Sequence, residues 1–253
     1  MTTSRIAVVT GAASGIGQAI AVGLGRLGWS VALGGRRIDA LATTAKLVDI
    51  EGGHAFAHHL DVTQPGSVDA FFDAAASELG PCDTLVNNAG LAIPGLLVDT
   101  DADALQREID TNLLGPLLCS RRALGPMLDA GRGDIVFISS DTARMPRPGM
   151  IGYSATKAAL ETVARVIDME TEGRGIRTTV VRVGPTLLTD FADGWKPGSF
   201  EHLLDLWPRF GIQRHFNTMQ PADIANVVIH ALTAPAHARV DTIEIQPVAP
   251  PVT

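Results

Sequence analysis

Three polar residues with different chemistry lie close together in the second half of the chain: Ser140, Tyr153 and Lys157. Tyr153 is the only tyrosine among 253 residues. Lys157 stands four positions after it, so on a helix the phenol and the ammonium share one face. A phenol with its usual pKa of about 10 is a weak base near neutral pH, and a cation within about 4–6 Å favours its ionised form. This spacing predicts a tyrosine that exchanges a proton with a substrate oxygen.

Ser140 follows the apolar run 134–139, which is typical of a buried strand. A serine hydroxyl at that strand end can hold a substrate oxygen while charge develops on it. Each residue also has a structural explanation: packing for the tyrosine, a turn or cap for the serine and solvation for the lysine. Their occurrence together, at the spacing S-x12-Y-x3-K, favours catalysis.

The elements that would position these residues alternate along the whole chain. Strands are predicted at 6–9, 30–34, 54–60, 84–88, 134–139, 177–183 and 242–246. Amphipathic helices lie between them, clearest at 65–79 and at 153–172, where the apolar side chains recur at helical spacing. This alternation predicts a single domain over residues 1–253: an α/β, Rossmann-type, doubly wound parallel sheet of about seven strands with helices on both faces.

A glycine-rich turn, TGAASGIG, follows the first predicted strand and opens a helix. Glycines there let the backbone approach a pyrophosphate, and the helix directs its N–H groups at the negative charge. We predict that this turn binds a dinucleotide. Its candidate contact residues are Gly11, Ser14, Gly15, Ile16 and Gly17.

With the spacing T-G-x-x-x-G-x-G, this turn and the S-x12-Y-x3-K pattern resemble the short-chain dehydrogenase/reductase family. The resemblance covers positions 5 to about 190. It implies that Tyr153 is the general acid in reduction and the general base in oxidation, and that Lys157 lowers the pKa of the tyrosine. It also implies that Tyr153 and Lys157 contact the cofactor, with Lys157 on the ribose hydroxyls, and that Ser140 orients the substrate oxygen.

A fourth catalytic residue, Asn112, is implied by the same resemblance. It lies in IDTNLLG, on the long helix predicted after the fourth strand. In the family, this asparagine holds a water that relays protons through the lysine and the cofactor ribose. The alternative is a buried helical asparagine with a purely structural partner.

The second strand ends in GGRR, which bears on the choice of cofactor. An acidic residue near this position binds the ribose 2′-hydroxyl of NAD and would repel a 2′-phosphate. Here the sequence has Arg36 and Arg37 instead, and a guanidinium can bind a phosphate through two hydrogen bonds. We therefore predict NADP(H), the alternatives being NAD(H) or two solvated arginines. Ser14 stands where many NADP-preferring relatives have a basic residue.

Further cofactor contacts are implied at three strand ends. Asp61 and Val62 match the family's adenine contacts, and the NNAG run supplies Asn88, Ala89 and Gly90. Asp and Asn also favour strand ends because they bind their own backbone, so turn chemistry is the alternative. After the sixth strand the family usually reads Pro-Gly, but this chain reads Gly-Pro. Its candidate contacts there are Pro185, Leu187 and Thr189.

Two C-terminal features extend the resemblance. The ending VDTIEIQPVAP looks like the branch that contains NADP-dependent serine and 3-hydroxy acid dehydrogenases, which supports NADP and a homotetramer. The family also places subunit contacts on the helices predicted at 104–128 and 153–172.

Residues 186–220 are predicted to form a lid over the nicotinamide. Its aromatic residues contact either an apolar substrate or one another and a neighbouring subunit: Phe191, Trp195, Phe200, Trp207, Phe210 and Phe216.

Two arginines beyond Ser140 have two interpretations. Arg144 and Arg147 either meet an anionic substrate or are solvated loop residues. His58 and His59 are neighbours on a strand and face opposite sides, so we assign no metal.

Composition limits the remaining classes of function. A formal charge of −7 argues against nucleic acid and anionic membranes as partners. No apolar run is long enough for a membrane span and no signal peptide is recognised, so a cytoplasmic location is expected. Cys82 and Cys119 are expected to be free thiols.

These features predict an NADP-dependent oxidoreductase that acts on a small carbonyl or secondary alcohol substrate. Two alternatives remain. One is an NAD-dependent alcohol dehydrogenase of the same family, and the other is a non-catalytic regulator that senses a dinucleotide.

Overall fold

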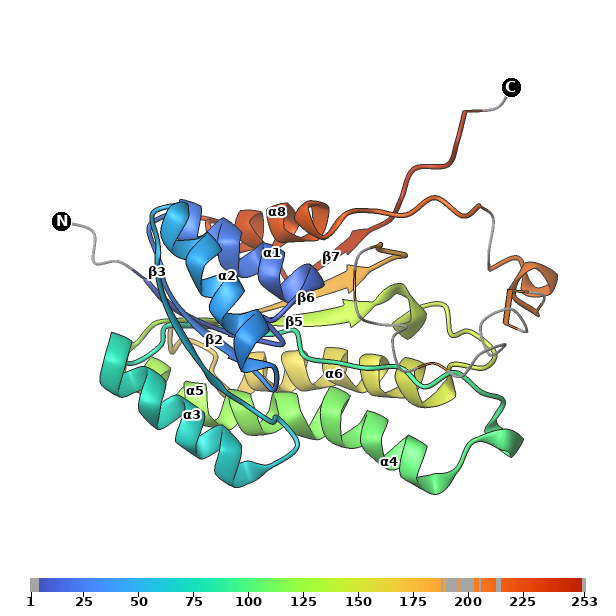
Figure 1. The fold of residues 1–253 in the computed structure, drawn as a ribbon, viewed down its shortest axis with the longest axis horizontal. Coiled ribbons are helices and arrows are strands. Elements are labelled where there is room, and N and C mark those ends of the chain that lie inside the picture. Colours follow the sequence, from blue (N-terminus) through green and yellow to red (C-terminus); the bar gives the residue numbers. More distant parts are fainter. Residues whose placement is uncertain are drawn as a thin grey trace.

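The computed structural model describes residues 5–187, 189, 195, 203–204, 206–212 and 215–251. In this part of the chain, seven parallel strands form one sheet in the order β3-β2-β1-β4-β5-β6-β7 (Figure 1). The strands are β1 (Ile6–Thr10), β2 (Ser30–Gly35), β3 (His54–His59), β4 (Thr84–Asn87), β5 (Gly133–Ser140), β6 (Ile176–Val183) and β7 (Thr242–Ile245). The predicted α/β, Rossmann-type fold is confirmed, and each predicted strand lies within two residues of an observed one.

The strand order reverses between β1 and β4. From β1 the chain adds β2 and β3 on one side, then returns to place β4 and the later strands on the other side. A crevice opens at such a reversal beyond the carboxyl ends of the strands, and ligands bind there in open parallel sheets. The glycine-rich turn after β1 and the NNAG run after β4 therefore meet at this crevice.

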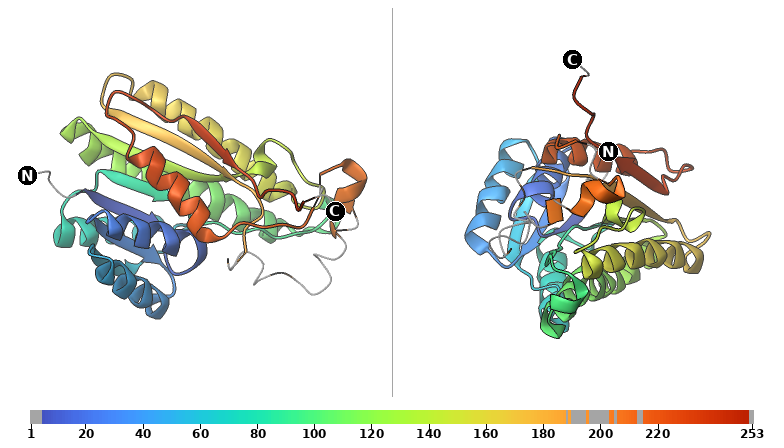
Figure 2. Two further views of the ribbon diagram at one scale, coloured as in Figure 1. Left: turned by 90° about the horizontal axis from the view of Figure 1, so that it is seen from above. Right: turned by 90° about the vertical axis from the view of Figure 1, so that its right-hand side faces the viewer.

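Helices cover both faces of the sheet (Figures 1 and 2). One face carries α1 (Gly15–Arg26), α2 (Ile38–Ile50) and α8 (Pro221–Leu232). The other carries α3 (Pro65–Leu79), α4 (Ala102–Ile109), α5 (Gly115–Ala130) and α6 (Ile151–Glu170). Helix α3 has the predicted bounds: Pro65 begins it, and Gly80 at φ +97° ends it in a conformation that favours glycine.

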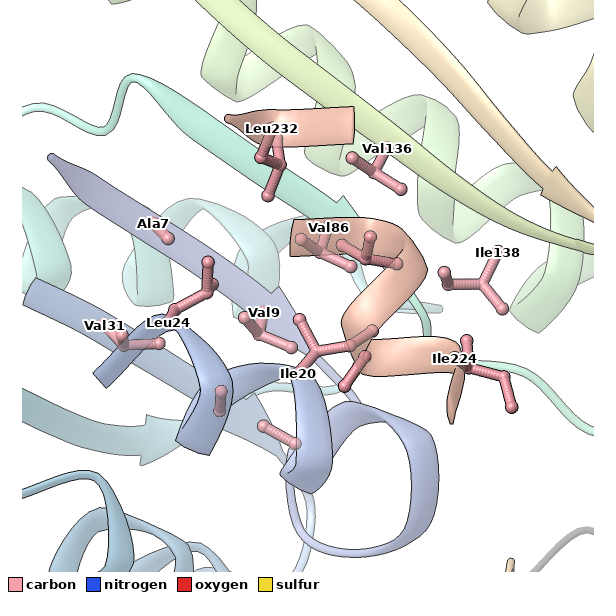
Figure 3. Close-up of a cluster of buried hydrophobic side chains, with 14 of the residues drawn as sticks. Ala7, Val9, Ile20, Leu24, Val31, Val86, Val136, Ile138, Ile224 and Leu232 are labelled. Atoms are coloured by element: carbon pink, nitrogen blue, oxygen red, sulfur yellow. The ribbon is translucent and has the colours of Figure 1, made fainter. Parts of the chain in front are cut away.

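Each face of the sheet has its own apolar core. On the α1/α8 side, Ile20 and Leu24 of α1 and Ile224 of α8 pack on Val9 and Val86 (Figure 3). The opposite core contains Phe71, Phe137 and Leu160, together with the buried free thiols of Cys82 and Cys119. Each large side chain so buried stabilises the fold by about 1.5–3 kcal/mol. The free thiols agree with the sequence prediction.

The predicted helix at 104–128 contains a wider turn. A π-helical segment, η2 (Asp110–Leu114), joins α4 to α5 and includes Asn112. Such insertions within a helix are frequent at functional sites. The extra residue in the turn cannot be read from apolar periodicity, so the sequence predicted an ordinary helix here.

Part of the predicted lid lies outside the described residues, including Phe191 and Phe200. In the described part, Trp207 is 5% exposed and packs with Met150 and Leu203 in a small third core. Trp195 packs against the same cluster and its indole donates to the Ala92 carbonyl at 2.9 Å. The lid's own core is therefore one role of these aromatic residues.

Buried arginine–aspartate pairs join the amino-terminal ends of the strands. Asp134 of β5 is 7% exposed and accepts hydrogen bonds from Arg5 at 2.5 Å and Arg177 at 2.7 Å. Arg5 also donates to Asp83 at 3.0 Å and lies 4.5 Å from the centroid of the Trp29 ring. These contacts connect β1, β4, β5 and β6 at the edge opposite the crevice.

The described helices include none long and apolar enough to cross a membrane. The organisation of residues 1–253 as a single domain stays a prediction.

Replacing Asp134 with alanine leaves two guanidinium groups without their buried partner. We expect Asp134→Ala to lower the free energy of unfolding by about 3–5 kcal/mol, measured by urea denaturation. Asp73→Ala is the control because Asp73 pairs with Arg122 at the surface, where an ion pair contributes about 0–1 kcal/mol. Equal losses in the two variants would contradict the assigned role.

Candidate active site

A cavity of about 1280 Å³ lies beyond the carboxyl ends of the strands. Its wall runs from the glycine-rich turn past Asp61 to Ser140, Tyr153 and Lys157, and then to Trp195 and Trp207. The cavity therefore joins the predicted dinucleotide site to the predicted catalytic residues.

The predicted catalytic residues meet at one point of the cavity wall. The Tyr153 hydroxyl forms a hydrogen bond with Ser140, which links α6 to the end of β5. Lys157 Nζ lies 5.6 Å from the centroid of the Tyr153 ring and donates to the carbonyl of Ile138 at 2.7 Å. The helical spacing thus brings phenol and ammonium to one side of α6, as the sequence indicated.

Burial dominates the electrostatics of this pair. It raises the pKa of the Tyr153 phenol to about 12, although the hydrogen bond with Ser140 acts in the opposite direction. It also lowers the pKa of Lys157, which is 3% exposed, to about 8. The pKa shift of the phenol is opposite to the one predicted, because desolvation outweighs the neighbouring charges. The phenol is consequently a proton donor at neutral pH.

Asn112 is fully buried in η2 and acts as a clamp. Its Oδ1 accepts from Leu91 N at 2.8 Å, and its Nδ2 donates to Leu91 O at 2.8 Å and to Thr156 Oγ1 at 3.2 Å. Thr156 in turn donates to the Tyr153 carbonyl at 2.8 Å. Asn112 therefore fixes the 91 region against the first turns of α6. The water relay implied by the family resemblance stays a prediction.

Glu108 is a neighbour of the site that the sequence analysis missed. It lies one turn before Asn112, is 1% exposed, and accepts a hydrogen bond from Ile93 N at 2.9 Å. Burial raises the pKa of its carboxyl group. A Cβ at Gly152 would lie 2.1 Å from Glu108 Oε2, so glycine leaves the room for this carboxylate. A charged residue within an amphipathic helix is usually exposed, so no local signal in the sequence indicated that Glu108 is buried.

The glycine-rich turn has the close contacts expected of a pyrophosphate site. Gly11 and Gly15 have φ of +65° and +55°, which favour glycine. Ser14 and Ile16 lie with them on the cavity wall. A Cβ at Gly17 would lie 2.4 Å from the Gly11 carbonyl, so this glycine packs beneath the turn and holds its shape.

Thr10 joins the two crevice turns, and it was not predicted from the sequence as a site residue. Its hydroxyl accepts from Asn88 N and Ala89 N, both at 3.0 Å. The Asn88 amide donates to the carbonyls of Thr10 and Gly11 at 2.9 and 3.2 Å. These hydrogen bonds hold the backbone of Asn88 and Ala89, after β4, against the turn after β1. The threonine before the first glycine was the available signal.

The two arginines after β2 are exposed at the cavity edge. Arg37 Nη2 donates to Ser14 Oγ at 2.8 Å, so a guanidinium stands beside the position where Ser14 replaces a basic residue. Arg36 lies close enough to Asp61 for its positive charge to lower the pKa of that carboxyl group. Both are placed to meet a phosphate near the first turn.

Asp61 combines turn chemistry with a place on the cavity wall. Its Oδ1 accepts from the amide and hydroxyl of Thr63 at 3.0 and 2.7 Å. Burial opposes ionisation, but these hydrogen bonds and the charge of Arg36 outweigh it and lower the pKa of Asp61. Val62 also lines the cavity and packs tightly at Gly115, where a Cβ would lie 2.8 Å from it.

The remaining predicted contacts also line the cavity: Gly90, Pro185, Leu187 and Thr189. A Cβ at Gly90 would lie 3.3 Å from Asn112 Oδ1 and 3.4 Å from Lys157 Nζ. Glycine at 90 therefore leaves space in the cavity next to Asn112 and Lys157. The segment after β6 is held by hydrogen bonds between Met219 N and Pro185 O and between Leu187 N and Met219 O, both at 2.9 Å.

The two loop arginines differ in their surroundings. Arg144 is exposed and bonds Glu244 through Nε and Nη2 at 2.9 and 2.7 Å. Arg147 lines the cavity, and its side chain is 13% exposed where it pairs with Asp141 at 2.6 Å. Arg144 is therefore a surface ion pair and Arg147 belongs to the site.

Among the residues that the structure describes, no group of three or more His, Cys, Asp or Glu side chains is placed to hold a metal ion. His58 stacks on Phe56, with the ring centroids 5.8 Å apart.

A parallel sheet with a glycine-rich turn at its crevice, and a serine, tyrosine and lysine on one cavity wall, defines a dinucleotide-dependent oxidoreductase of Rossmann type. Residues 5–198 match the family model described as short chain dehydrogenase. The chain therefore belongs to the short-chain dehydrogenase family and is an NAD(P)-dependent oxidoreductase.

Known proteins resemble the chain over almost its whole length. A protein of Emericella nidulans named glycine betaine reductase ATRR is 36% identical over 99% of this chain, but the match covers only 19% of that protein. An alcohol dehydrogenase from the archaeon Thermococcus sibiricus, solved with 5-hydroxy-NADP, has a TM-score of 0.84 and 29% identity, and the match covers 99% of this chain and 100% of that one. A serine dehydrogenase solved with NADP+ has a TM-score of 0.84 and 27% identity, and the match covers 98% and 99% of the two chains.

Removing the buried ammonium should stabilise the protein while damaging the site. Because burial lowers the pKa of Lys157 from 10.5 to about 8, keeping it protonated at pH 7 costs folding free energy. We expect Lys157→Met to raise the free energy of unfolding at pH 7 by about 1–3 kcal/mol, measured by urea denaturation.

The sign can be tested by varying pH. The unfolded chain keeps the Lys157 proton up to higher pH than the folded protein, so wild-type stability should gain on that of Lys157→Met between about pH 8 and 10.5. Lys46→Met, at an exposed position of α2, is the control and should change little. A Lys157→Met variant less stable than wild type at pH 7 would contradict the desolvation argument.

Proposed function

We propose that this enzyme transfers a hydride between NADP(H) and a carbonyl or secondary alcohol substrate, with Tyr153 as the proton donor and acceptor. One observation carries the proposal. The Tyr153 hydroxyl is bonded to Ser140 on the wall of the cavity that also contains the glycine-rich turn, and the Lys157 ammonium is buried next to the ring. Proton transfer and dinucleotide binding can then occur in one enclosed space.

NADP(H) bound at the glycine-rich turn and Arg36 would supply the hydride in reduction and would accept it in oxidation. In reduction, the developing alkoxide is a far stronger base than a phenolate, so Tyr153 donates its proton even though burial raises its pKa. Ser140 donates a hydrogen bond to the same oxygen and stabilises the charge while it forms. Lys157 stabilises the resulting phenolate. Oxidation reverses these steps, and the positive charge of Lys157 then favours the phenolate that removes the proton.

Asn112 has a positioning role in this proposal. Its amide holds Leu91 beside Gly90 and contacts Thr156 on α6, so it fixes the floor next to Lys157. The relay of protons through Lys157 and the ribose belongs to the same proposal.

Replacing Tyr153 with phenylalanine tests the proton-transfer role. We expect kcat to fall by about 10²–10⁴-fold because the proton donor is lost while the ring remains. The Kd for NADPH, measured by fluorescence titration, should change less than about threefold. Ser154→Ala is the matched control on the next residue of α6, and it should keep wild-type turnover. A Tyr153→Phe variant with more than a tenth of wild-type kcat would refute the mechanism.

The preference for NADP(H) is supported by Arg36 and Arg37 at the cavity edge and by the hydrogen bond from Arg37 to Ser14. Two solved relatives carry NADP or a derivative of it, which supports the same cofactor here. Arg36 and Arg37, rather than an acidic residue, follow β2 directly, so the repulsion that a 2′-phosphate would meet there is missing. NAD(H) is the alternative.

Reversing the charge at position 36 tests this preference. We expect Arg36→Asp to raise the KM for NADPH by about 10–100-fold, because a phosphate contact is lost and a repulsive charge is added. The KM for NADH should stay the same or fall. Arg121→Asp, on the exposed side of α5, is the control for the change in net charge. Unchanged NADPH kinetics would show that the 2′-phosphate does not meet Arg36.

The substrate class is proposed from the names of the relatives. The relatives are named as a betaine reductase, an alcohol dehydrogenase and a serine dehydrogenase, so we propose a small aldehyde, ketone or hydroxy acid. A panel that adds quinones and 3-oxoacyl thioesters, assayed with NADPH and NADH, separates this proposal from an NAD-dependent alcohol dehydrogenase. No turnover with any member would favour a dinucleotide sensor.

A homo-oligomer, either a dimer or a tetramer, is supported by apolar side chains on the outer face of α4, η2, α5 and α6. Leu117 is 40% exposed, Val166 44% and Met169 74%. Such side chains are costly in water when they gather on one face, and a second copy of the chain would cover them.

A further inference from the structure

The residue that follows the catalytic serine carries a carboxylate directed at it. Asp141 is 7% exposed, and its Oδ1 lies 3.3 Å from Ser140 Oγ. Ser140 Oγ also accepts from Thr142 N at 3.2 Å and is bonded to the Tyr153 hydroxyl. A serine hydroxyl has one proton, and an ionised carboxylate can only accept. While Tyr153 is protonated, the Ser140 proton therefore points to Asp141, and the serine oxygen accepts from Tyr153. When the phenol ionises, the serine proton turns to the phenolate, and this donated bond is the one that lowers the phenol pKa.

Asp141 is itself held from two sides. Arg147 Nη2 donates to its Oδ2 at 2.6 Å, and Gln246 Nε2 donates to the same oxygen at 3.2 Å. The side chain of Arg147 is 13% exposed and that of Asp141 is 9% exposed, so this ion pair is shielded from water. Breaking a shielded ion pair costs folding free energy. The guanidinium of Arg147 also lies 5.3 Å from the centroid of the Trp207 ring.

The departure from the family pattern after β6 connects to this pair. A Cβ at position 184 would lie 2.4 Å from Gln246 Oε1, so glycine leaves room for the glutamine beside Asp141. The order Gly184-Pro185 thus accommodates a residue that contacts the Asp141 carboxylate.

Charged groups reach Tyr153 from three elements. Asp141 and Arg147 come from the segment after β5, Glu108 from α4, and Lys157 from α6 itself. Burial has the largest effect on the phenol and raises its pKa, and the bond to Ser140 acts against it. Asp141 raises this pKa further, whereas Arg147 lowers it. The two members of the ion pair therefore act on the proton donor with opposite signs.

We propose that Asp141 and Arg147 are a positioning pair for the Ser140–Tyr153 hydrogen bond. Arg147 holds Asp141, Asp141 orients the Ser140 proton, and this leaves the serine oxygen to accept from Tyr153. When a substrate oxygen enters, the serine proton turns from Asp141 to that oxygen without any covalent step. The inference rests on the proposed function of Ser140 and Tyr153 and adds two residues to it.

Tyr153 is the only tyrosine, so one resonance reports its ionisation. Protein labelled with 13Cζ-tyrosine and saturated with NADP+ is titrated by NMR as wild type, Asp141→Asn, Arg147→Gln and the double variant. Removing the carboxylate charge should lower the phenol pKa by about one unit, and removing the guanidinium charge should raise it by a similar amount. Arg144→Gln, on the same loop but paired with Glu244, should leave it unchanged.

The double variant keeps the test informative if Arg147→Gln leaves Asp141 unpaired and fails to fold. Asp141→Asn/Arg147→Gln removes both charges, and its phenol pKa should return to within about half a unit of wild type. In oxidation, kcat against pH should shift in the same directions, while the KM for NADP+ changes less than twofold. Shifts of the same sign in Asp141→Asn and Arg147→Gln, or none in Asp141→Asn, would overturn the proposal.

The outcome is distinguishable from a failure of the proposed function. If Tyr153→Phe remained active, the mechanism itself would be wrong, whatever the titrations show. If Tyr153→Phe is inactive and the titrations show no opposed shifts, only the role of the Asp141–Arg147 pair is refuted.

Discussion

The ammonium of Lys157 is buried inside the protein, and several residues of the site pack against it. It donates to the Ile138 carbonyl at the end of β5 and lies beside the Tyr153 ring. A charge in this position costs folding free energy, which the lowered pKa of Lys157 expresses. Gly90 leaves space next to the ammonium, because a Cβ there would lie 3.4 Å from Lys157 Nζ. Asn112 fixes the backbone of the next residue, Leu91, by accepting a hydrogen bond from its N–H. The buried Lys157 ammonium, which lowers the stability of the fold, is thus held in place by the elements that pack around it.

The parallel sheet makes this arrangement possible. Because every strand runs the same way, the turns after β1, β3, β4, β5 and β6 open on one edge, and residues far apart in sequence meet there. The opposite edge is joined by the pairs of Arg5 and Arg177 with Asp134. At their amino-terminal ends the strands are therefore joined by ion pairs, and at their carboxyl ends the turns form the cavity wall.

Burial also decides the protonation state of Tyr153. With its pKa raised to about 12, the phenol is a protonated donor near neutral pH, which suits reduction directly. Oxidation needs the phenolate, and the charges of Lys157 and Arg147 favour it, whereas those of Asp141 and Glu108 oppose it. The neighbouring charged groups therefore act together with burial on how readily Tyr153 gives up its proton.

The sequence by itself determined the α/β fold, the order of its elements and the position of Tyr153 and Lys157 on one side of a helix, because apolar periodicity and short-range spacing act within one element. The catalytic role of these two residues and of Ser140 is a proposal. The sequence also marked the turns at Gly11 and Asn88. Only the tertiary structure decided the π-helical turn at Asn112, the raised phenol pKa, the burial of Glu108, and the different surroundings of Arg144 and Arg147. Those properties depend on which distant side chains exclude water from a group or pair with it, and no local pattern encodes that.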